Sequence, residues 1–358
     1  MQATRLLGNP RIWYVYPMWH IVSFTLIAEK HIAQLRKYFL VEKVDELAFP
    51  HIMPMSKPIV FIHPFFFIVG KYGRILSRKL HLYRYIIGVD VADSDHISEL
   101  AVSMTDYANA MIVPSTFAMR AYIRSGVRTP VYVVPHGLDK EWYEKPNTAQ
   151  KYFDDLIRLK QRRGAKLLLF FLWHSSYRKG FDIVYNLYRR LRRERKDVLL
   201  VFKTKTANGK EAQMMRSIGA IHIYGWLTEE QKMALYDACD IYILASRGGG
   251  FEMNGLEALA RGLPVIAARG GSWEDYLPDY LLVDSRPTPY VLENNPIHDG
   301  KGVEMIIEKA VDKIHDILEN MDEYKARINT HREKIKKIFN WETIGKKLAS
   351  IVRNVSTK

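Results

Sequence analysis

The chain has 358 residues, of which 48% are hydrophobic and 26% charged, and its formal net charge at pH 7 is +14. This length favours two domains, since one hydrophobic core seldom extends past roughly 250 to 300 residues, and the composition excludes a mainly disordered or fibrous chain. A positive net charge of this size favours an acidic partner. Nucleic acid, an anionic membrane and a phosphate-bearing ligand are the three kinds considered.

No apolar stretch reaches the roughly 20 residues that a bilayer-spanning helix needs. The first residues, MQATRLLGNPRIWYVYP, carry a proline and charges where a signal peptide has its apolar run, so we expect neither a membrane span nor export. The single cysteine, Cys239, cannot form an internal disulfide, which fits a reducing compartment. We expect a cytoplasmic protein, with peripheral membrane association also considered.

Short β-branched runs alternate with amphipathic stretches of helical period from Ile12 onward, which indicates βαβ units and parallel sheets. The composition then turns polar over residues 148–164, and we place a domain boundary there. In the first half, the expected strands are 12–17, 58–63, 83–89, 110–114 and 131–135, and the expected helices are 24–38 and 98–109.

The second half repeats this alternation. Thr228 and Gln231 form a capping-box pattern at the start of a helix. The first expected strand ends at Trp173. The others span 198–204, 220–226, 240–246, 263–268 and 280–283. The predicted fold is α/β, with two doubly wound Rossmann-like domains that face a central cleft. Its parts are a first Rossmann-like domain at 1–160, a second at 161–338 and a C-terminal helix at 339–358, for which a return to the first domain is considered.

A glycine-rich loop, SRGGGFE from Ser246 to Glu252, follows an expected strand and precedes a helix that starts near Asn254. Glycines let the backbone approach a bulky anion closely, and a helix N-terminus presents unpaired N–H groups. We predict a phosphate or diphosphate here; a plain glycine-rich turn is the alternative. Glu257, one turn into the helix, is a candidate for binding ribose hydroxyls, or else a solvated surface residue.

The order GGGFEMNGLEALARGLPV, preceded by GWLTEEQKMALYDACDIYILAS, resembles the donor half of the retaining GT-B glycosyltransferases of family 4 (glycosyl transferases group 1). The resemblance covers roughly Ala101 to Ile351 and includes RKGFD from Arg178 and FNWE at 339–342. It implies a GT-B fold, a nucleoside diphosphate sugar as substrate, retention of configuration, no cofactor and no metal.

The resemblance assigns most site residues to the second half. Lys179 matches the lysine of a basic pair that neutralises the donor diphosphate, His174 stands where arginine is usual, and Arg178 is placed to supply the missing charge. Gly225 and Trp226 match the turn near the nucleobase. The remaining donor-binding residues are Gly248, Gly249, Gly250, Phe251, Asn254 and Glu257.

One position departs from the family pattern. The family commonly has two glutamates separated by seven residues; the second matches Glu257, and the first position is Gly249 here. Glu252 is the candidate for the missing carboxylate, since a glycine loop is conformationally permissive. Fixed cations stabilise the charge that develops on a leaving diphosphate. The predicted catalytic residues are Lys179, Arg178, His174 and Glu252.

The first half offers His63, Asp90 and His96 as acceptor-side candidates, at or after the carboxyl ends of expected strands, where open α/β sheets place ligands. A buried or capping role is the alternative for His63. Asp93 and Asp95 form an Asp-x-Asp pattern that suits a divalent cation. The donor motifs lie in the other half, however, and we predict no metal site.

Residues 64–88 contain no acid and interleave aromatic side chains with five cations, which are Lys71, Arg74, Arg78, Lys79 and Arg84. Two interpretations stand side by side: a surface that rests on an anionic membrane, or a core-packed segment with one solvated basic face. A second basic run near Arg190 is expected on the exposed face of a helix.

The predicted function is transfer of a sugar from a nucleoside diphosphate sugar to a hydroxyl acceptor, for which lipid-linked and protein-linked glycans are considered. A nucleic-acid-binding protein is one alternative, motivated by the charge; no recognised motif supports it, so we expect no nucleic-acid partner. A non-catalytic sugar-nucleotide-binding protein, motivated by Gly249, and a nucleotide-sugar epimerase on the same fold are the others.

Overall fold

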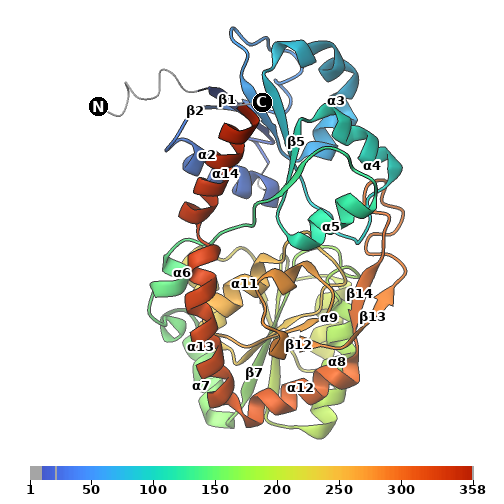
Figure 1. Cartoon of the computed structure of the whole chain (residues 1–358). Helices are drawn as coiled ribbons and strands as arrows, with labels where there is room; N and C mark the ends of the chain where they lie inside the picture. Colours follow the sequence, from blue (N-terminus) through green and yellow to red (C-terminus); the bar gives the residue numbers. More distant parts are fainter. Residues whose placement is uncertain (1–9, 21, 357–358) are drawn as a thin grey trace. The chain divides into compact units, whose positions relative to one another are not determined.

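The computed structural model describes residues 10–20 and 22–356. The chain forms two compact units (Figure 1). Unit 1 comprises Met1–Gly137, Leu292–Gly300 and Ile338–Lys358, and unit 2 comprises Leu138–Val291 and Lys301–Lys337. Residues 1–9, on which the expectation about export partly rests, lie outside the described part of the chain.

Unit 1 contains a six-stranded parallel sheet in the order β2-β1-β3-β4-β5-β6. Five of these strands confirm the predicted runs. The sequence analysis missed β2, because it is an edge strand whose alternating exposure leaves only a weak apolar signal. The bounds are β1 (Arg11–Tyr16), β2 (Leu40–Asp45), β3 (Ile59–Ile62), β4 (Tyr85–Val89), β5 (Ala110–Val113) and β6 (Val131–Val133).

Helices lie between these strands in the chain. They are α2 (Ser23–Leu35), α3 (Phe65–Lys79), α4 (Glu99–Met104) and α5 (Thr116–Arg124), with short 3-10 turns at Leu80–Leu82 and Thr105–Tyr107. The last helix, α14 (Trp341–Ser356), also belongs to this unit and packs on α2. Gly345 lets the two helices approach, since a Cβ there would lie 2.8 Å from the Cβ of Gln34.

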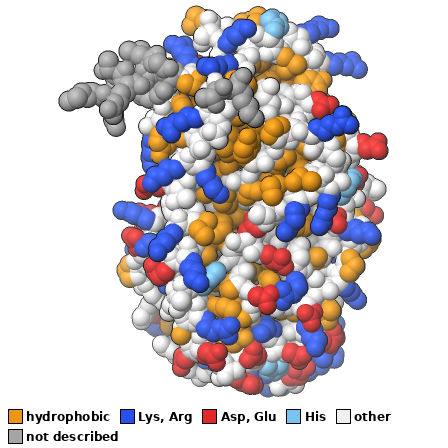
Figure 2. Space-filling model, viewed as in Figure 1, with side chains coloured by type: hydrophobic (Ala, Val, Ile, Leu, Met, Phe, Trp, Pro, Cys, Tyr) orange, Lys and Arg blue, Asp and Glu red, His pale blue; other side chains and the backbone are white. Residues whose placement is uncertain are grey.

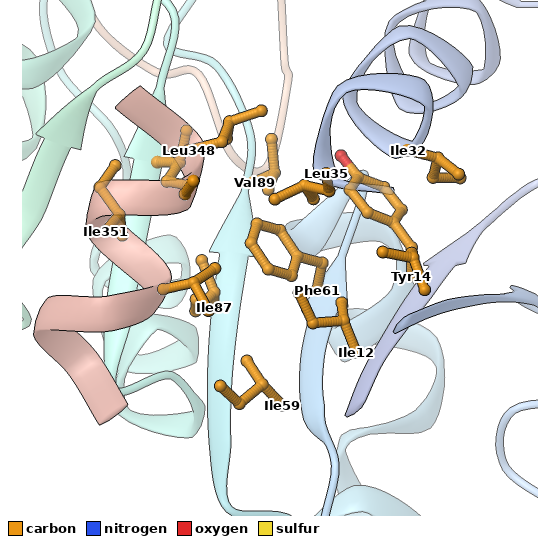
Figure 3. Packing of buried hydrophobic residues seen from close by; sticks show 14 of the residues in the cluster. Ile12, Tyr14, Ile32, Leu35, Ile59, Phe61, Ile87, Val89, Leu348 and Ile351 are labelled. Carbon is orange, nitrogen blue, oxygen red and sulfur yellow. The ribbon is translucent and has the colours of Figure 1, made fainter. Parts of the chain in front are cut away.

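One hydrophobic core of unit 1 lies between the sheet and the pair α2 and α14. Figure 3 shows side chains of β1, β3 and β4 facing those of the two helices. Tyr14 stacks on Phe61 with ring centroids 5.2 Å apart, and Leu348 and Ile351 come from α14. The C-terminal helix is therefore part of this core, because its buried face is continuous with it.

Unit 2 contains a second six-stranded parallel sheet, in the order β12-β11-β10-β7-β8-β9. Strands β8 and β9 follow β7 toward one edge of the sheet, and β11 and β12 follow β10 toward the other edge. The strand order therefore reverses between β7 and β10. Ligands of open α/β sheets bind at such a point, beyond the carboxyl ends of the strands. The bounds are β7 (Lys166–Leu172), β8 (Val198–Thr204), β9 (Ile221–Tyr224), β10 (Ile241–Leu244), β11 (Val265–Ala268) and β12 (Leu282–Val283).

The helices of unit 2 flank this sheet (Figure 1). The predicted capping box opens α10: the Thr228 hydroxyl accepts from the backbone of Gln231, whose side chain accepts from Thr228 N–H. The antiparallel pair β13 (Ser285–Thr288) and β14 (Gly302–Met305) was not expected. The helices are α6 (Glu141–Glu144), α7 (Ala149–Arg163), α8 (Phe181–Glu194), α9 (Lys210–Ser217), α10 (Glu229–Ala238), α11 (Met253–Ala260), α12 (Ile307–Glu319) and α13 (Met321–Ile338).

Unit 2 begins before the domain boundary that the sequence analysis set at residue 160. The polar stretch 148–164 is not a linker but contains α7, which packs against α10. Lys160 of α7 donates to Asp240 at 2.9 Å, and Leu156 is buried. An amphipathic surface helix and a linker have similar compositions, so the polarity of this stretch alone was misleading.

Leu348→Ala tests whether α14 is part of the unit 1 core. The side chain is fully buried, so we expect a loss of about 2–5 kcal/mol in the free energy of unfolding from lost burial and the cavity left behind. The exposed neighbour Lys347→Ala is the control and should change stability by less than about 0.5 kcal/mol. Urea unfolding measures both, and equal small effects would contradict this role of α14.

Candidate functional site

The loops that follow β7 and β10 meet at the point where the strand order of unit 2 reverses. Gly180, in the loop after β7, has φ of +71°, and a Cβ there would clash with the carbonyl of Ala245 at the end of β10. The N–H of Arg247 donates to the carbonyl of Arg178 at 2.7 Å. The two elements predicted to bind phosphate are thus joined directly through their backbones.

The buried side chain of Arg247 locks this junction. Its guanidinium donates to the carbonyl of Tyr177 at 2.7 Å and to both carboxylate oxygens of Asp182, at 2.8 and 2.6 Å. It also donates to Glu304 of β14, at 2.8 and 2.5 Å. Burial opposes the charge, but the hydrogen bonds to Asp182 and Glu304 outweigh it and raise the pKa of Arg247. The sequence analysis missed this residue, because its partners lie far away in the chain.

Lys179, Arg178 and Glu252 come together at the junction. The ammonium of Lys179 donates to both carboxylate oxygens of Glu252, at 2.8 and 2.6 Å, and Arg178 Nη1 lies 3.8 Å from Oε1. The hydroxyl of Ser246 donates to the same oxygen at 3.1 Å. The side chain of Glu252 is 4% exposed, so this group of charges is shielded from water.

Gly249 and Glu252 share one space. A Cβ on Gly249 would lie 2.5 Å from Oε1 of Glu252, and 3.4 Å from Nη1 of Arg178. The carboxylate of Glu252 therefore lies beside the point where a side chain at position 249 would begin. The loop is fixed in this arrangement by Tyr276, whose hydroxyl donates to the carbonyl of Glu252 at 2.6 Å.

A second buried carboxylate lies one turn into α11. Glu257 is 4% exposed, so the alternative of a solvated surface residue is wrong. Lys232 donates to one of its oxygens at 2.6 Å and Tyr236 to the other at 2.9 Å. Burial, and then the charge of Glu257, raises the pKa of Tyr236 well above its ordinary value, so its hydroxyl keeps its proton. Lys232 and Tyr236 were missed, although their spacing of four residues on α10 places them on one helix face.

The Gly225–Trp226 turn follows β9 and is held by Lys203. The Lys203 ammonium donates to the carbonyl of Gly225 at 2.5 Å and lies 4.4 Å from the ring centre of Trp173. Burial, and then the charge of Lys232, lowers the pKa of Lys203 to about 8. Trp173 and Trp226 meet edge to face with centroids 5.7 Å apart, and both are exposed. The turn thus presents an aromatic surface.

A cavity of about 150 Å³ opens at the carboxyl ends of β7 and β8. It is lined by residues 172–176, 204–206, 208–209 and 211–212. His174 lies in this lining, with its Nδ1 2.8 Å from the hydroxyl of Ser175. The ion pairs of Glu252 are with Lys179 and Arg178.

The acceptor-side candidates of unit 1 have structural partners. His63 follows β3 and is 2% exposed, with its Nδ1 3.3 Å from the hydroxyl of Tyr14, which also lies 2.8 Å from Nδ1 of His31. Asp90 accepts from the N–H of Phe66 at 2.7 Å, in the first turn of α3. His63 is thus buried, which is the alternative stated for it, and Asp90 is hydrogen-bonded to the backbone at the start of α3.

His96 and the half-buried Asp-x-Asp pattern of Asp93 and Asp95 also lie in unit 1. His96 pairs with Asp299 at 2.8 Å, and both side chains are exposed. The backbone of Asp93 donates to His298 at 3.4 Å. Within residues 10–20 and 22–356, no three His, Cys, Asp or Glu side chains gather in a metal-binding arrangement. In the same part of the chain, no helix is both long and apolar enough to cross a bilayer.

Comparisons with known proteins identify the class. Residues 165–289 match the family model described as glycosyl transferases group 1. Uncharacterized protein 356 of Sulfolobus islandicus rod-shaped virus 1 is 35% identical over 356 residues, which cover 96% of this chain and 99% of that protein. The chain belongs to the family of this viral protein and contains a group 1 glycosyltransferase domain at residues 165–289.

Solved structures share the fold. Sucrose-phosphate synthase from Thermosynechococcus elongatus superposes with a TM-score of 0.70 at 14% identity, covering 98% of this chain and 100% of that one. A trehalose-6-phosphate protein from E. coli bound with UDP-2-fluoro glucose gives 0.66 at 9% identity, covering 96% and 99%. The predicted GT-B class, with two parallel α/β sheets, is therefore confirmed.

Gly249→Ala tests the shared space. The new methyl group must displace the carboxylate of Glu252 from Lys179, so we expect the free energy of unfolding to fall by about 1–3 kcal/mol. In a protein that already carries Glu252→Ala, the Gly249→Ala change should lower the free energy of unfolding far less, because the carboxylate that clashes with the new methyl group is absent. Gly73→Ala in α3, where the nearest atom to the new methyl is 3.5 Å away, is the control and should not destabilise. Additive losses in the double variant would contradict the contact.

Stability in acid tests the buried histidines. Burial lowers the pKa of His31 to about 3 and of His136 to about 4, and that of His63 well below 6.5. Between about pH 6.5 and 4 the unfolded chain binds protons at these histidines that the folded chain does not, so stability falls as pH falls, by about 1.4 kcal/mol per unit for each. Asp90, whose pKa burial raises to about 7, acts in the opposite sense.

Two variants separate these contributions. His31→Phe should flatten the pH dependence of the unfolding free energy by about one proton, and Asp90→Asn should steepen it by about one proton over the same range. Urea unfolding at a series of pH values measures both slopes. Parallel slopes in wild type and both variants would contradict the assignment.

Proposed function

We propose that unit 2 binds a nucleoside diphosphate sugar and that the enzyme transfers this sugar to a hydroxyl acceptor with retention of configuration and without a metal ion. The observation that carries the proposal is the pair Lys179 and Arg178, gathered on Glu252 where the strand order reverses between β7 and β10. A diphosphate is the part of such a donor that needs fixed cations.

The ammonium of Lys179 has three N–H donors, and the two oxygens of Glu252 engage it from one side. A phosphate oxygen bound beside Glu252 would accept from the same ammonium. As the bond between the sugar and the diphosphate breaks, its electron pair passes to the diphosphate, and a preorganised cation in a shielded site stabilises the added charge. Because these cations belong to the protein, the proposal requires no divalent metal.

Glu257 is proposed to bind the ribose. Each of its oxygens already accepts one hydrogen bond, from Lys232 or Tyr236, but a carboxylate oxygen accepts more than one. Ribose hydroxyls would complete its shell. The Gly225–Trp226 turn, with Trp173 beside it, offers backbone groups and an aromatic surface for the base. Asn254 and residues 248–251 would line the sugar side of the donor.

Retention is proposed to arise from attack on the face of the sugar that the diphosphate leaves. The acceptor oxygen bonds to the anomeric carbon, and its proton passes to an oxygen of the departing phosphate, so this step needs no separate protein base. Glu252, which lies against Gly249, is proposed to contact the sugar while positioning Lys179. The nucleotide sugar in the E. coli structure supports this class of donor.

The first experiment is a thermal-shift screen against nucleotides and nucleotide sugars, with short DNA and RNA alongside. A selective response to one nucleotide sugar and its parent diphosphate would support the proposal and name the donor. NMR of the product, with and without EDTA, then tests retention and metal independence. Stabilisation by nucleic acid alone would overturn the proposal, and an altered sugar formed without acceptor would indicate an epimerase.

Lys179→Ala should lower kcat by about 10²–10³, the effect of removing one donor that stabilises developing charge. Lys196→Ala, an exposed lysine of unit 2, is the matched control and should leave kcat unchanged. The double variant Lys179→Ala/Glu252→Gln removes both charges, so it keeps the test valid if the single variant folds poorly. Full activity in either Lys179 variant would exclude the proposed role.

A further inference from the structure

The segment from residue 47 to residue 89 contains no Asp or Glu, and the structure collects much of its charge on one side of α3. The helix buries five residues and leaves a stripe exposed along its length. The buried residues are Phe65, Phe66, Ile68, Val69 and Leu76. The exposed stripe is Phe67, Lys71, Arg74, Ile75 and Arg78, whose spacing of three or four residues puts them on one helix face.

A neighbouring loop is attached to the end of α3. Lys79, at the end of α3, donates to the carbonyls of Pro50 and Ile52, at 2.7 and 3.0 Å. The loop is therefore tied to the helix, and its methionines Met53 and Met55 are 63% and 98% exposed. The α3 surface is defined here as Met53, Met55, Phe67, Lys71, Arg74, Ile75, Arg78 and Leu80.

The cations of this surface form no close ion pair within the described residues, and only Lys71 acts at longer range on a carboxyl, that of Glu46. Among the ion pairs formed within the described residues, none involves Lys71, Arg74 or Arg78. Lys71 instead lies over the rings of Phe67 and Tyr72, at 5.9 and 5.1 Å. This differs from α8, where the cation Arg190 pairs with Glu194 and Glu308.

Apolar exposure accompanies the charge. Phe67 is 55% exposed, and Ile75 and Leu80 are 38% exposed, beside the two methionines. In the view of Figure 2, Lys and Arg side chains lie among hydrophobic ones over unit 1. Isolated apolar residues on a surface are ordinary, but here they alternate with unpaired cations on one helix and its loop. A nucleic acid would use the cations and have little use for exposed Met, Ile and Leu side chains.

We propose that the α3 surface binds the anionic face of a lipid bilayer. The apolar side chains would enter the boundary between headgroups and acyl chains, while the cations remain among lipid phosphates. Each cation is expected to contribute about fivefold in affinity at low ionic strength. This goes beyond the proposed function, since it involves neither the donor nor the chemistry of transfer, and it is measured without either.

The experiment is co-sedimentation of the full chain with vesicles of phosphatidylcholine mixed with phosphatidylglycerol, and with vesicles of phosphatidylcholine alone. Wild type should bind the anionic vesicles and bind the neutral ones far more weakly. The charge-reversal variant Lys71→Glu/Arg74→Glu/Arg78→Glu should lose at least about a hundredfold in affinity, at about fivefold for each cation removed. Near-UV circular dichroism confirms that each variant is folded.

The matched control reverses three exposed cations of α8 and its following loop, Arg189→Glu/Arg193→Glu/Lys196→Glu, with the same change of net charge. It should bind the anionic vesicles about as well as wild type. Equal losses in the two triple variants would show that net charge alone is responsible and would overturn the proposal.

A second variant, Phe67→Ser/Ile75→Ser, tests insertion. In high salt, where screening weakens the charge contribution, it should lose most of the remaining vesicle binding. Unchanged binding would overturn the insertion of apolar side chains. Binding of duplex DNA or RNA that depends on Lys71, Arg74 and Arg78, without vesicle binding, would assign the surface to nucleic acid instead.

Discussion

The site of this enzyme depends on one buried cation, Arg247. Removing a guanidinium from water is costly unless charged partners surround it, and Asp182, Glu304 and the carbonyl of Tyr177 do so here. Those partners come from the loop after β7, from α8 and from β14. Because the backbone of Arg247 also donates to Arg178, satisfying this one charge fixes the loop after β10 against the loop after β7. Lys179, the next residue of that loop, donates to Glu252.

The unit 2 site is a set of paired charges that a ligand can extend. Glu252 is held by Lys179, and Glu257 by Lys232 and Tyr236. Each buried carboxylate is thus satisfied before a ligand arrives, which keeps the site folded and preorganised in a low-dielectric environment. The two groups would bind different parts of a ligand. At Glu252, the ammonium of Lys179 would donate to phosphate oxygens. At Glu257, the carboxylate would accept from hydroxyl groups.

Unit 1 distributes its ionisable groups differently. Its buried histidines His31 and His63 stay neutral around the hydroxyl of Tyr14, whereas Lys71, Arg74 and Arg78 of α3 are exposed and form no close ion pair within the described residues. The net charge of +14 is therefore not a uniform property of the molecule. In unit 2 the cations of the site are engaged with carboxylates, and along α3 they are available to an external anion. The excess charge and the donor site are separate features.

The sequence by itself determined the class of fold and the segments of the site, because β-branched runs, a capping box and a glycine loop are local signals with local causes. It also suggested Glu252 as a substitute for a side chain at Gly249. It did not reveal β2, the β13–β14 pair or the role of α7, whose polar compositions resemble loops. Only the tertiary structure decided that Glu252 reaches Lys179, that Glu257 is buried and that Arg247 joins three segments. These contacts link residues far apart in the chain, and a packed backbone alone fixes their distances.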